Sequence, residues 1–230
     1  LPFEKDWYRK HAPANLRVEY VGHPVLEEIP NLPYEPNPNS LVIMPGSRES
    51  EWRALFGPMI EAAALLGRGN KNLEFTLPLA EPLRGNNLVK SFLSPTGPHG
   101  DAIRSLGEAL KISESPAHES LRKAKAAWIA SGTATLEAAV VGTPMVVAYK
   151  VSAGTAFLFR HFVRYQGPVA IVNLIHGGLG TTERLVPEIL QDEVEPLNLA
   201  SAMREVMHGS VWEKQRSELA RTREILSGPG

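Results

Sequence analysis

Small residues and an arginine meet at the end of an apolar run early in the chain. Residues 41–44 (LVIM) lead into Gly46, Ser47 and Arg48, and a helical pattern begins directly afterwards. Gly46 permits close approach of the backbone, and Ser47 can cap the helix. The free N–H groups at a helix start favour a phosphate, and Arg48 could add a bidentate contact. A plain helix cap with a surface arginine would look the same, so both interpretations stay open.

A second turn of small residues follows another apolar run. Ser131, Gly132 and Thr133 come after AAWIA and open the stretch TATLEAAVVG, which predicts a helix whose start again suits a diphosphate. Glu137 lies about one helical turn further on, where its carboxylate could accept two hydroxyl hydrogen bonds, as from a ribose. The alternative is a buried helix acid satisfied by the loop. Two such turns facing one cleft favour a nucleotide.

A third candidate region contains Asn173, Glu188 and Gln191. Asn173 follows an expected strand, and its amide could recognise a uracil or sugar edge. The glycines of His176-Gly177-Gly178-Leu179-Gly180 are a candidate lid. Glu188 and Gln191 are three positions apart and would share one face of a helix. They could bind sugar hydroxyls, although the residues alone favour a solvated face.

Composition excludes several classes of function. The chain has no cysteine, which removes disulfide scaffolds, thiolate metal sites and a cysteine nucleophile. Its seven histidines show no metal-ligand spacing, so we expect no metal site. We also expect no cofactor. With 24 basic and 25 acidic residues the net charge is −1, and we expect no nucleic-acid partner. No apolar run approaches the roughly 20 residues of a transmembrane helix.

Strand-type and helix-type stretches alternate along most of the chain. Short apolar or β-branched runs predict strands at 17–21, 41–44, 73–79, 110–112, 126–130, 144–149 and 169–172. Helices are expected at 1–11, 49–67, 87–93, 116–124, 133–142, 153–165, 195–208 and 210–227. This alternation predicts an α/β protein with a Rossmann-like, doubly wound parallel sheet and helices on both faces. A ligand should then bind at the carboxyl ends of the strands.

Two stretches differ from the rest in composition. Residues 24–40 contain five prolines and three asparagines and are expected to be a stiff linker. Residues 157–164 (FLFRHFVR) mix aromatic with basic side chains. A core helix with a solvated edge is favoured for them, and a helix lying on a membrane surface is the alternative. Segment 155–164 is therefore the place where we would look for a peripheral membrane contact.

Several motifs together resemble the bacterial lipid-A-disaccharide synthase family. They are LPFE, YVGHP, MPGSRESE, ASGTATLEAAVVGTPMVVAYKVS, and NLI with LVPEILQDEVEP. The resemblance spans residue 1 to about residue 207, and SGTATLE closely followed by PMVVAYK is its most specific part. It implies a GT-B glycosyltransferase, a fold of two Rossmann-like domains of which the carboxyl-terminal one binds the UDP-sugar.

The resemblance also implies a reaction and a division of the chain. Such enzymes transfer 2,3-diacylglucosamine from its UDP carrier to 2,3-diacylglucosamine 1-phosphate, with inversion, without metal and with release of UDP. We expect the end of an amino-terminal domain and a hinge at 1–23, the linker at 24–40, the UDP-sugar-binding domain at 41–208, and a carboxyl-terminal helix at 209–230. The lipid acceptor and the general base would belong mainly to the amino-terminal domain, which we expect to lie upstream of this sequence.

Site residues are carried over by position in the family motifs. The expected donor contacts are Gly46, Ser47, Arg48, Glu51, Ser131, Gly132, Thr133, Glu137, Asn173, Glu188 and Gln191. The sequence departs from the family at HGGLGTTER, where the usual stretch is shorter and the order of Glu183 and Arg184 is reversed. That departure concerns the contacts to the sugar more than those to the diphosphate.

Other functions remain open on the sequence alone. A GT-B domain could belong to a UDP-N-acetylglucosamine 2-epimerase, or it could bind a UDP-sugar without turning it over. The resemblance implies a cytoplasmic enzyme, with peripheral attachment to the inner face of the cytoplasmic membrane and homo-oligomer formation as open questions.

Overall fold

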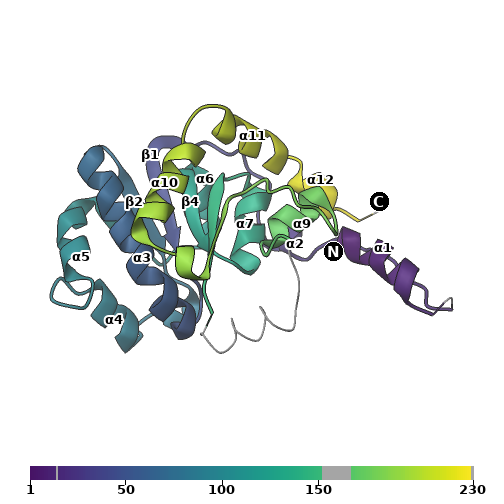
Figure 1. Ribbon diagram of the computed structural model, residues 1–230, viewed down its shortest axis with the longest axis horizontal. Helices are drawn as coiled ribbons and strands as arrows, with labels where there is room; N and C mark the ends of the chain where they lie inside the picture. The colour runs from purple at the N-terminus through teal and green to yellow at the C-terminus, as the bar shows by residue number, and fades with distance from the viewer. Residues whose placement is uncertain (14, 152–166, 229–230) are drawn as a thin grey trace.

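A six-stranded parallel sheet forms the centre of the molecule (Figure 1). The computed structural model describes residues 1–228 apart from residue 14 and residues 152–166. The strand order is β3-β2-β1-β4-β5-β6, and every pair of neighbours is parallel. The strands are β1 (Asn37–Met44), β2 (Glu74–Pro78), β3 (Leu110–Ser113), β4 (Ala124–Ala130), β5 (Met145–Tyr149) and β6 (Glu188–Leu190). The predicted doubly wound α/β class is confirmed.

Helices cover both faces of the sheet. The α-helices of the described residues are α1 (Pro2–His11), α2 (Val25–Glu28), α3 (Glu49–Gly69), α4 (Asn87–Leu93), α5 (Gly100–Leu106), α6 (Ala117–Lys123), α7 (Thr133–Val141), α9 (Ile171–Gly177), α10 (Pro196–Val206), α11 (Gly209–Leu219) and α12 (Thr222–Leu226). Helices α3, α5 and α10 pack in the core on one face, and α6, α7, α9 and α11 in the core on the other. None of the described helices is both long and apolar enough to cross a membrane.

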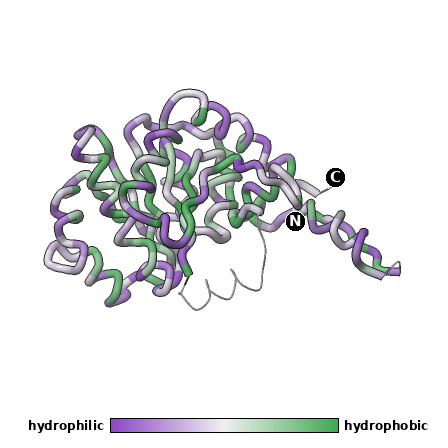
Figure 2. The backbone as a smooth tube through the Cα atoms, viewed as in Figure 1, coloured by the Kyte–Doolittle hydropathy of each residue, from purple (hydrophilic) through white to green (hydrophobic). Residues whose placement is uncertain are grey.

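Alternating side chains of each strand supply the two cores. In β1, Leu41 and Ile43 face α3 and α10, whereas Val42 between them faces α6 and α7. All three are fully buried, as expected for a parallel sheet covered on both faces. Hydrophobic stretches, drawn in green, run through the strands in the middle of the body (Figure 2). These continuous apolar runs made strands β1, β2, β4 and β5 predictable.

The strand order reverses direction between β1 and β4. From β1 the chain winds outward through β2 to β3, and from β4 it winds the other way through β5 to β6. Helix α3 follows β1 onto one face and α7 follows β4 onto the opposite face. In open α/β sheets, the crevice at the carboxyl ends of two such strands is the usual ligand site.

A third, smaller core joins the two ends of the described chain to α7 and α9. It contains Val25 and Ile29 from the α2 region and Leu226 from α12. The Tyr20 hydroxyl donates to the Leu226 carbonyl at 2.8 Å, and Arg223 donates to the carbonyls of Ile29 and Pro30 at 2.6 and 3.0 Å. Helix α12 thus holds the α2 region against the sheet domain.

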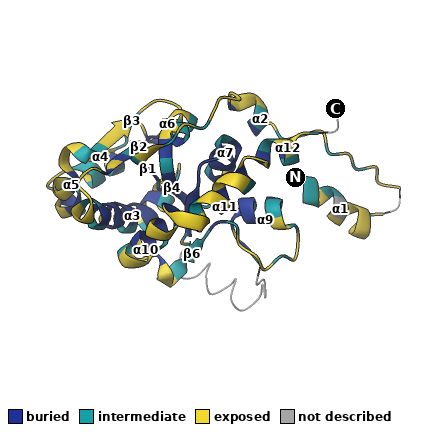
Figure 3. Ribbon diagram, turned by 90° about the horizontal axis from the view of Figure 1, so that it is seen from above, coloured by how far each residue is buried: buried dark blue, intermediate teal, exposed yellow. Residues whose placement is uncertain are grey.

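Helix α1 extends away from this body (Figures 1 and 3). Its first residues reach the third core, where Leu1 and Phe3 pack. Further along the helix, Trp7 and Tyr8 leave 47% and 44% of their surface exposed. The helix therefore presents aromatic surface that the described part of the chain does not cover.

The strand predicted at 169–172 is wrong, and its place in the sheet is taken by later residues. Residues 169–172 lead into helix α9, and the strand beside β5 is β6. The β-branched run Ile171-Val172 resembles a strand, but the carboxylate of Glu188 accepts the N–H groups of Val169 and Ala170 and so favours a helix start. Asn173, expected in a loop after a strand, consequently lies inside α9.

Other differences concern the ends of elements. Residues 17–21 form no strand, because a strand needs a hydrogen-bonded neighbour and no described strand lies beside them. The expected linker includes helix α2 and the first residues of β1, where Pro38 coincides with a register shift against β4. The helix expected at 210–227 is divided into α11 and α12. The helix expected at 153–165 and the membrane contact considered at 155–164 lie outside the described residues.

Candidate functional site

A cavity of about 500 Å³ opens at the carboxyl ends of β1 and β4. Its volume lies in the range of small-molecule and cofactor sites. The turns that follow the two strands form opposite parts of its wall, as the topology of the sheet requires. Eight of the eleven predicted site residues line it, namely Gly46, Ser47, Arg48, Glu51, Ser131, Gly132, Thr133 and Glu137. The two turns predicted to face one cleft therefore do so.

The turn after β1 is closed by a carboxylate of its own helix. One Glu51 oxygen accepts the N–H groups of Ser47 and Arg48, at 2.8 and 3.2 Å. The other oxygen lies 3.3 Å from the guanidinium of Arg48. We expected free N–H groups at this helix start, but these two are already satisfied. The turn thus offers a ligand the side chains of Ser47 and Arg48, but not the N–H groups of these two residues.

Glycine is required for that arrangement. Gly46 has φ of +116°, and a Cβ atom built on it would lie 2.1 Å from the nearer Glu51 oxygen. Any larger residue would displace the carboxylate. The next residue of α3 holds the turn from the other side, because Trp52 donates its indole N–H to the Gly46 carbonyl at 3.1 Å.

The turn after β4 is open by comparison. Gly132 precedes α7 with φ of 158° and ψ of −160°, a region reached almost only by glycine. Within the described part of the chain, no side chain caps the start of α7. A Cβ atom on Gly132 would meet nothing within 4 Å. The N-terminus of α7 therefore faces the cavity with its first N–H groups uncovered by side chains.

Glu137 lies one helical turn inside α7 and also lines the cavity. Among the residues that the structure describes, its carboxylate has no hydrogen-bond or ion-pair partner. Burial raises the pKa of Glu137, and the nearby charge of Glu28 raises it further. An unpaired, partly buried carboxylate at a cavity wall is suited to accept hydroxyl groups from a ligand.

Four further charged or titratable residues of the wall were missed by sequence reasoning. Glu28 arrives on α2, Glu81 and Arg84 on the segment after β2, and His118 on the start of α6. Arg84 and His118 follow the carboxyl ends of β2 and β3, so the rule used for β1 and β4 would have found them. Glu28 comes from the expected linker, and no local signal places it at the site.

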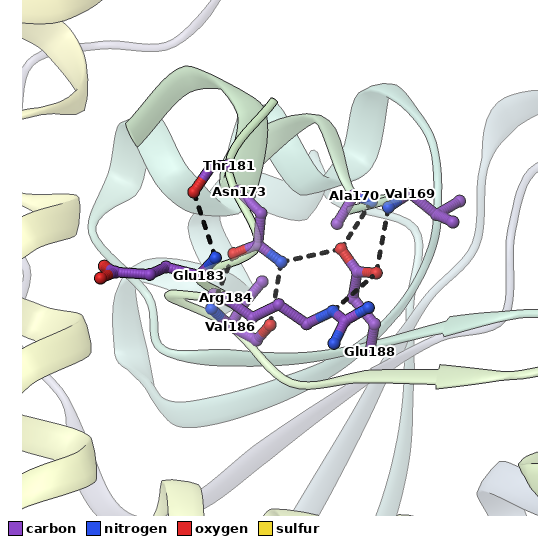
Figure 4. Close-up of polar contacts among 8 residues, drawn as sticks. All are labelled: Val169, Ala170, Asn173, Thr181, Glu183, Arg184, Val186 and Glu188. Carbon is purple, nitrogen blue, oxygen red and sulfur yellow. Dashed lines mark hydrogen bonds and ion pairs between the residues drawn. The ribbon is translucent and has the colours of Figure 1, made fainter. Parts of the chain in front are cut away.

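Asn173 and Glu188 lie outside the cavity wall and bind each other (Figure 4). The Asn173 amide nitrogen donates to Glu188 at 2.8 Å and to the Val186 carbonyl at 3.0 Å, and its oxygen accepts the Val186 N–H at 2.9 Å. The Glu188 side chain is only 1% exposed and also accepts the N–H groups of Val169 and Ala170. Its charge is balanced by Arg184 at 3.5 Å.

These contacts satisfy every hydrogen-bonding atom of the Asn173 side chain inside the fold. Glu188 begins strand β6, and Gln191 follows it in a short 3-10 turn, so the expected common helical face is wrong. Gln191 has a φ of 51°, and its side-chain oxygen accepts the Val151 N–H at 3.3 Å. The structure thus separates these three residues from the eight that share the cavity. Their predicted contacts to the donor stay predictions.

Histidine and carboxylate groups do not gather into a metal-binding cluster anywhere in the described ranges. The cavity wall carries charges of both signs. Arg48 and Arg84 supply positive charge, Glu28 and Glu137 supply carboxylates close to one another, and Glu51 and Glu81 also line the wall. Such a wall can bind an anionic group at one part and hydroxyl groups at another.

Comparison with known sequences gives a consistent result. The family model for lipid-A-disaccharide synthetase matches residues 1–228. Lipid-A-disaccharide synthase from Myxococcus xanthus is 32% identical over the whole chain, which covers 58% of that relative. The Bradyrhizobium diazoefficiens enzyme is 35% identical over 99% of the chain, which covers 56% of it. The chain thus spans a little under three fifths of the length of these relatives.

Comparison with solved structures supports the fold. A structure of S. aureus TarM in complex with UDP and two sugar compounds matches 96% of the chain with a TM-score of 0.51 and 14% identity. A Listeria monocytogenes structure described as a UDP-N-acetylglucosamine 2-epimerase matches 94% of it with a TM-score of 0.50 and 16% identity. At such low identity these matches show a shared GT-B type fold and nothing about substrate.

Proposed function

The chain belongs to the lipid-A-disaccharide synthase family, and from this premise we propose that its cavity binds the UDP part of a UDP-sugar donor. One observation carries the proposal. The cavity lies where the strand order reverses, and it combines an uncapped helix start at Gly132 with a carboxylate at Glu137 that has no partner among the described residues. A diphosphate next to a ribose needs those two features side by side.

We assign a part of the donor to each part of the wall. The diphosphate binds at the start of α7, next to Ser131, Gly132 and Thr133, and the guanidinium of Arg48 balances its charge. Glu137 accepts the ribose hydroxyls, for which its ionised form is required. Support comes from the position of these residues around one cavity of about 500 Å³.

The reaction proposed for the whole protein is the one its family name describes. The 6-hydroxyl oxygen of 2,3-diacylglucosamine 1-phosphate attacks the anomeric carbon of UDP-2,3-diacylglucosamine. A β-1,6 bond forms, the bond to the UDP oxygen breaks, and inversion follows from direct displacement. Arg48 and the start of α7 stabilise the charge that develops on the departing UDP. A base outside this chain takes the hydroxyl proton, so these 230 residues alone would bind donor without turnover.

We propose further that residues 1–23 pack against the part of the protein that carries the acceptor. The exposed aromatic surface of α1, with Trp7 and Tyr8, supports this assignment. The boundaries at 24–40 and 209, the location in the cell and the oligomeric state stay predictions. A membrane contact at 155–164 also stays a prediction.

Calorimetric titration with UDP and with ADP, without added metal, tests the donor site. We expect saturable UDP binding and at least tenfold weaker ADP binding. Equal affinity for both nucleotides, or no binding by folded protein, would contradict the proposal. The activity is then tested with UDP-2,3-diacylglucosamine and 2,3-diacylglucosamine 1-phosphate, following disaccharide and UDP. Conversion of UDP-N-acetylglucosamine to its manno epimer would instead indicate the epimerase alternative.

A further inference from the structure

The carboxylate of Glu51 is fully engaged by the turn that precedes its own helix. It accepts two backbone N–H groups, from Ser47 and Arg48, and contacts the Arg48 guanidinium. Its side chain is 25% exposed, whereas that of Arg48 is 78% exposed. A family-motif carboxylate at a sugar-nucleotide site would ordinarily be assigned to ligand hydroxyls. The contacts on Glu51 point to a different role.

We propose that Glu51 is a positioning residue, which acts on the donor through Arg48 and does not touch the donor itself. This inference rests on the proposed function, because it assumes that Arg48 faces a bound diphosphate. The same carboxylate fixes the backbone at the base of Arg48 and restrains the charged end of its side chain. Both contacts therefore act on one residue of the cavity wall.

The energetic reason lies in the freedom of an arginine side chain. Ordering a long, exposed side chain on binding costs conformational entropy. A partner that holds the guanidinium near its bound position lowers that cost before the ligand arrives. The close approach at Gly46, where a Cβ atom would lie 2.1 Å from the carboxylate, shows how tightly the turn is built around Glu51.

The fold contains the same arrangement a second time. Glu188 accepts the N–H groups of Val169 and Ala170 just before α9, and its carboxylate contacts Arg184. There the carboxylate is buried outside the cavity wall, so its role is internal to the fold. In this molecule, a glutamate that binds two consecutive N–H groups and one arginine therefore stabilises local structure without a ligand.

A double-mutant cycle on UDP affinity tests the inference. The variants are Glu51→Gln, Arg48→Ala and the two combined, titrated with UDP by calorimetry. Glutamine keeps an oxygen for the N–H groups but loses the ion pair, so the turn should still form. We expect about fivefold weaker binding for Glu51→Gln and at least tenfold for Arg48→Ala. The combined variant should bind within twofold of Arg48→Ala, because Glu51 acts through the residue already removed.

Glu49→Gln is the matched control, since Glu49 lies on the same helical turn, binds Arg53 and Asn86 and does not line the cavity. It should bind UDP like the unmodified protein. Losses that multiply in the combined variant would mean that Glu51 contacts the donor directly and would overturn the inference. Unchanged affinity of Glu51→Gln would overturn it too, while leaving the donor site intact. Absence of UDP binding to the unmodified protein would overturn the proposed function and this inference with it.

Discussion

The turns after β1 and β4 occupy equivalent places in the sheet but are built in opposite ways. The β1 turn carries its own anion, because Glu51 binds the N–H groups of Ser47 and Arg48. The β4 turn leads into α7 without a side-chain cap in the described structure, and Gly132 opens it to the cavity. A helix start attracts negative charge in either case. Under the proposed function, the protein supplies that charge at the β1 turn and the donor supplies it at the β4 turn.

One acidic residue in the first helical turn distinguishes two turns that look alike in sequence. Both turns combine a glycine with small polar residues before a helix, and both looked equally suited to phosphate. A glutamate three positions after the helix cap, as Glu51 is after Arg48, predicts self-capping. No acidic residue stands in the first turn of α7. We propose that the presence or absence of that residue separates a turn that positions a side chain from one that receives an anion.

Substitution of Gly132 should break the open turn most severely. Gly132→Ala places a side chain on a backbone conformation that costs about 1–3 kcal/mol for other residues, and the helix start shifts to relieve it. We expect UDP affinity to fall about 100-fold, or about 2.7 kcal/mol, in calorimetry. The melting temperature should fall as well.

Gly142→Ala is the control for that strain. Gly142 ends α7 with φ of +89° and does not line the cavity. It should lower the melting temperature while leaving UDP affinity unchanged. Equal UDP affinity in the two variants would show that the open turn does not bind the diphosphate.

Substitution of Asn173 tests whether its hydrogen bonds to Val186 and Glu188 stabilise the fold. Asn173→Ala leaves buried partners at Val186 and Glu188 unsatisfied, so we expect about 2 kcal/mol lower stability in urea unfolding. The folded protein should still bind UDP normally. Asn198→Ala, which removes one hydrogen bond of an exposed asparagine, should cost under 1 kcal/mol. Lost UDP affinity with unchanged stability would instead assign Asn173 to the ligand.

Glu137→Gln removes the charge of this side chain but keeps its shape, and so tests whether the ligand needs the carboxylate. Hydrogen bonds to a charged acceptor are stronger by about 1.4 kcal/mol than those to a neutral one, so UDP affinity should fall about tenfold. Because the pKa of Glu137 is raised, its ionised form disfavours the fold, increasingly as pH rises above the value in the unfolded chain. The melting temperature of ligand-free Glu137→Gln at neutral pH should therefore rise. A lower melting temperature would mean that the carboxylate has an internal structural partner.

Glu28→Gln should have the smallest effect. Removing this charge lowers the pKa of Glu137, since Glu28 contributes to raising it. The loss of UDP affinity on acidification should then begin at lower pH than in the unmodified protein. In the acid range the variant should bind UDP about threefold more tightly, measured by titration at several pH values. Glu27→Gln on the same short helix is the control, because Glu27 does not line the cavity. Identical pH profiles for Glu28→Gln and the unmodified protein would remove Glu28 from the site.

Sequence reasoning worked where chemistry and structure are local. The buried runs of β1, β4 and β5 and the turns that follow them can be read from adjacent residues, so eight of the predicted residues line one cavity. It failed near α9 and β6, because the helix start there is set by Glu188, 18 positions along the chain from Ala170. Glu28 was missed for the same reason, since tertiary packing alone brings α2 to the cavity.

The contact between α12 and the residues before β1 bears on the order in which the molecule folds. The hydrogen bond from Tyr20 to Leu226 joins positions 206 residues apart. Closing so long a loop costs more conformational entropy than forming the local strand and helix pairs, so the contact should form late and open first. The same α12 contact holds the segment with Glu28 and Ile29, both of which line the cavity. A chain that has not completed its last folding step would therefore lack one wall of the site.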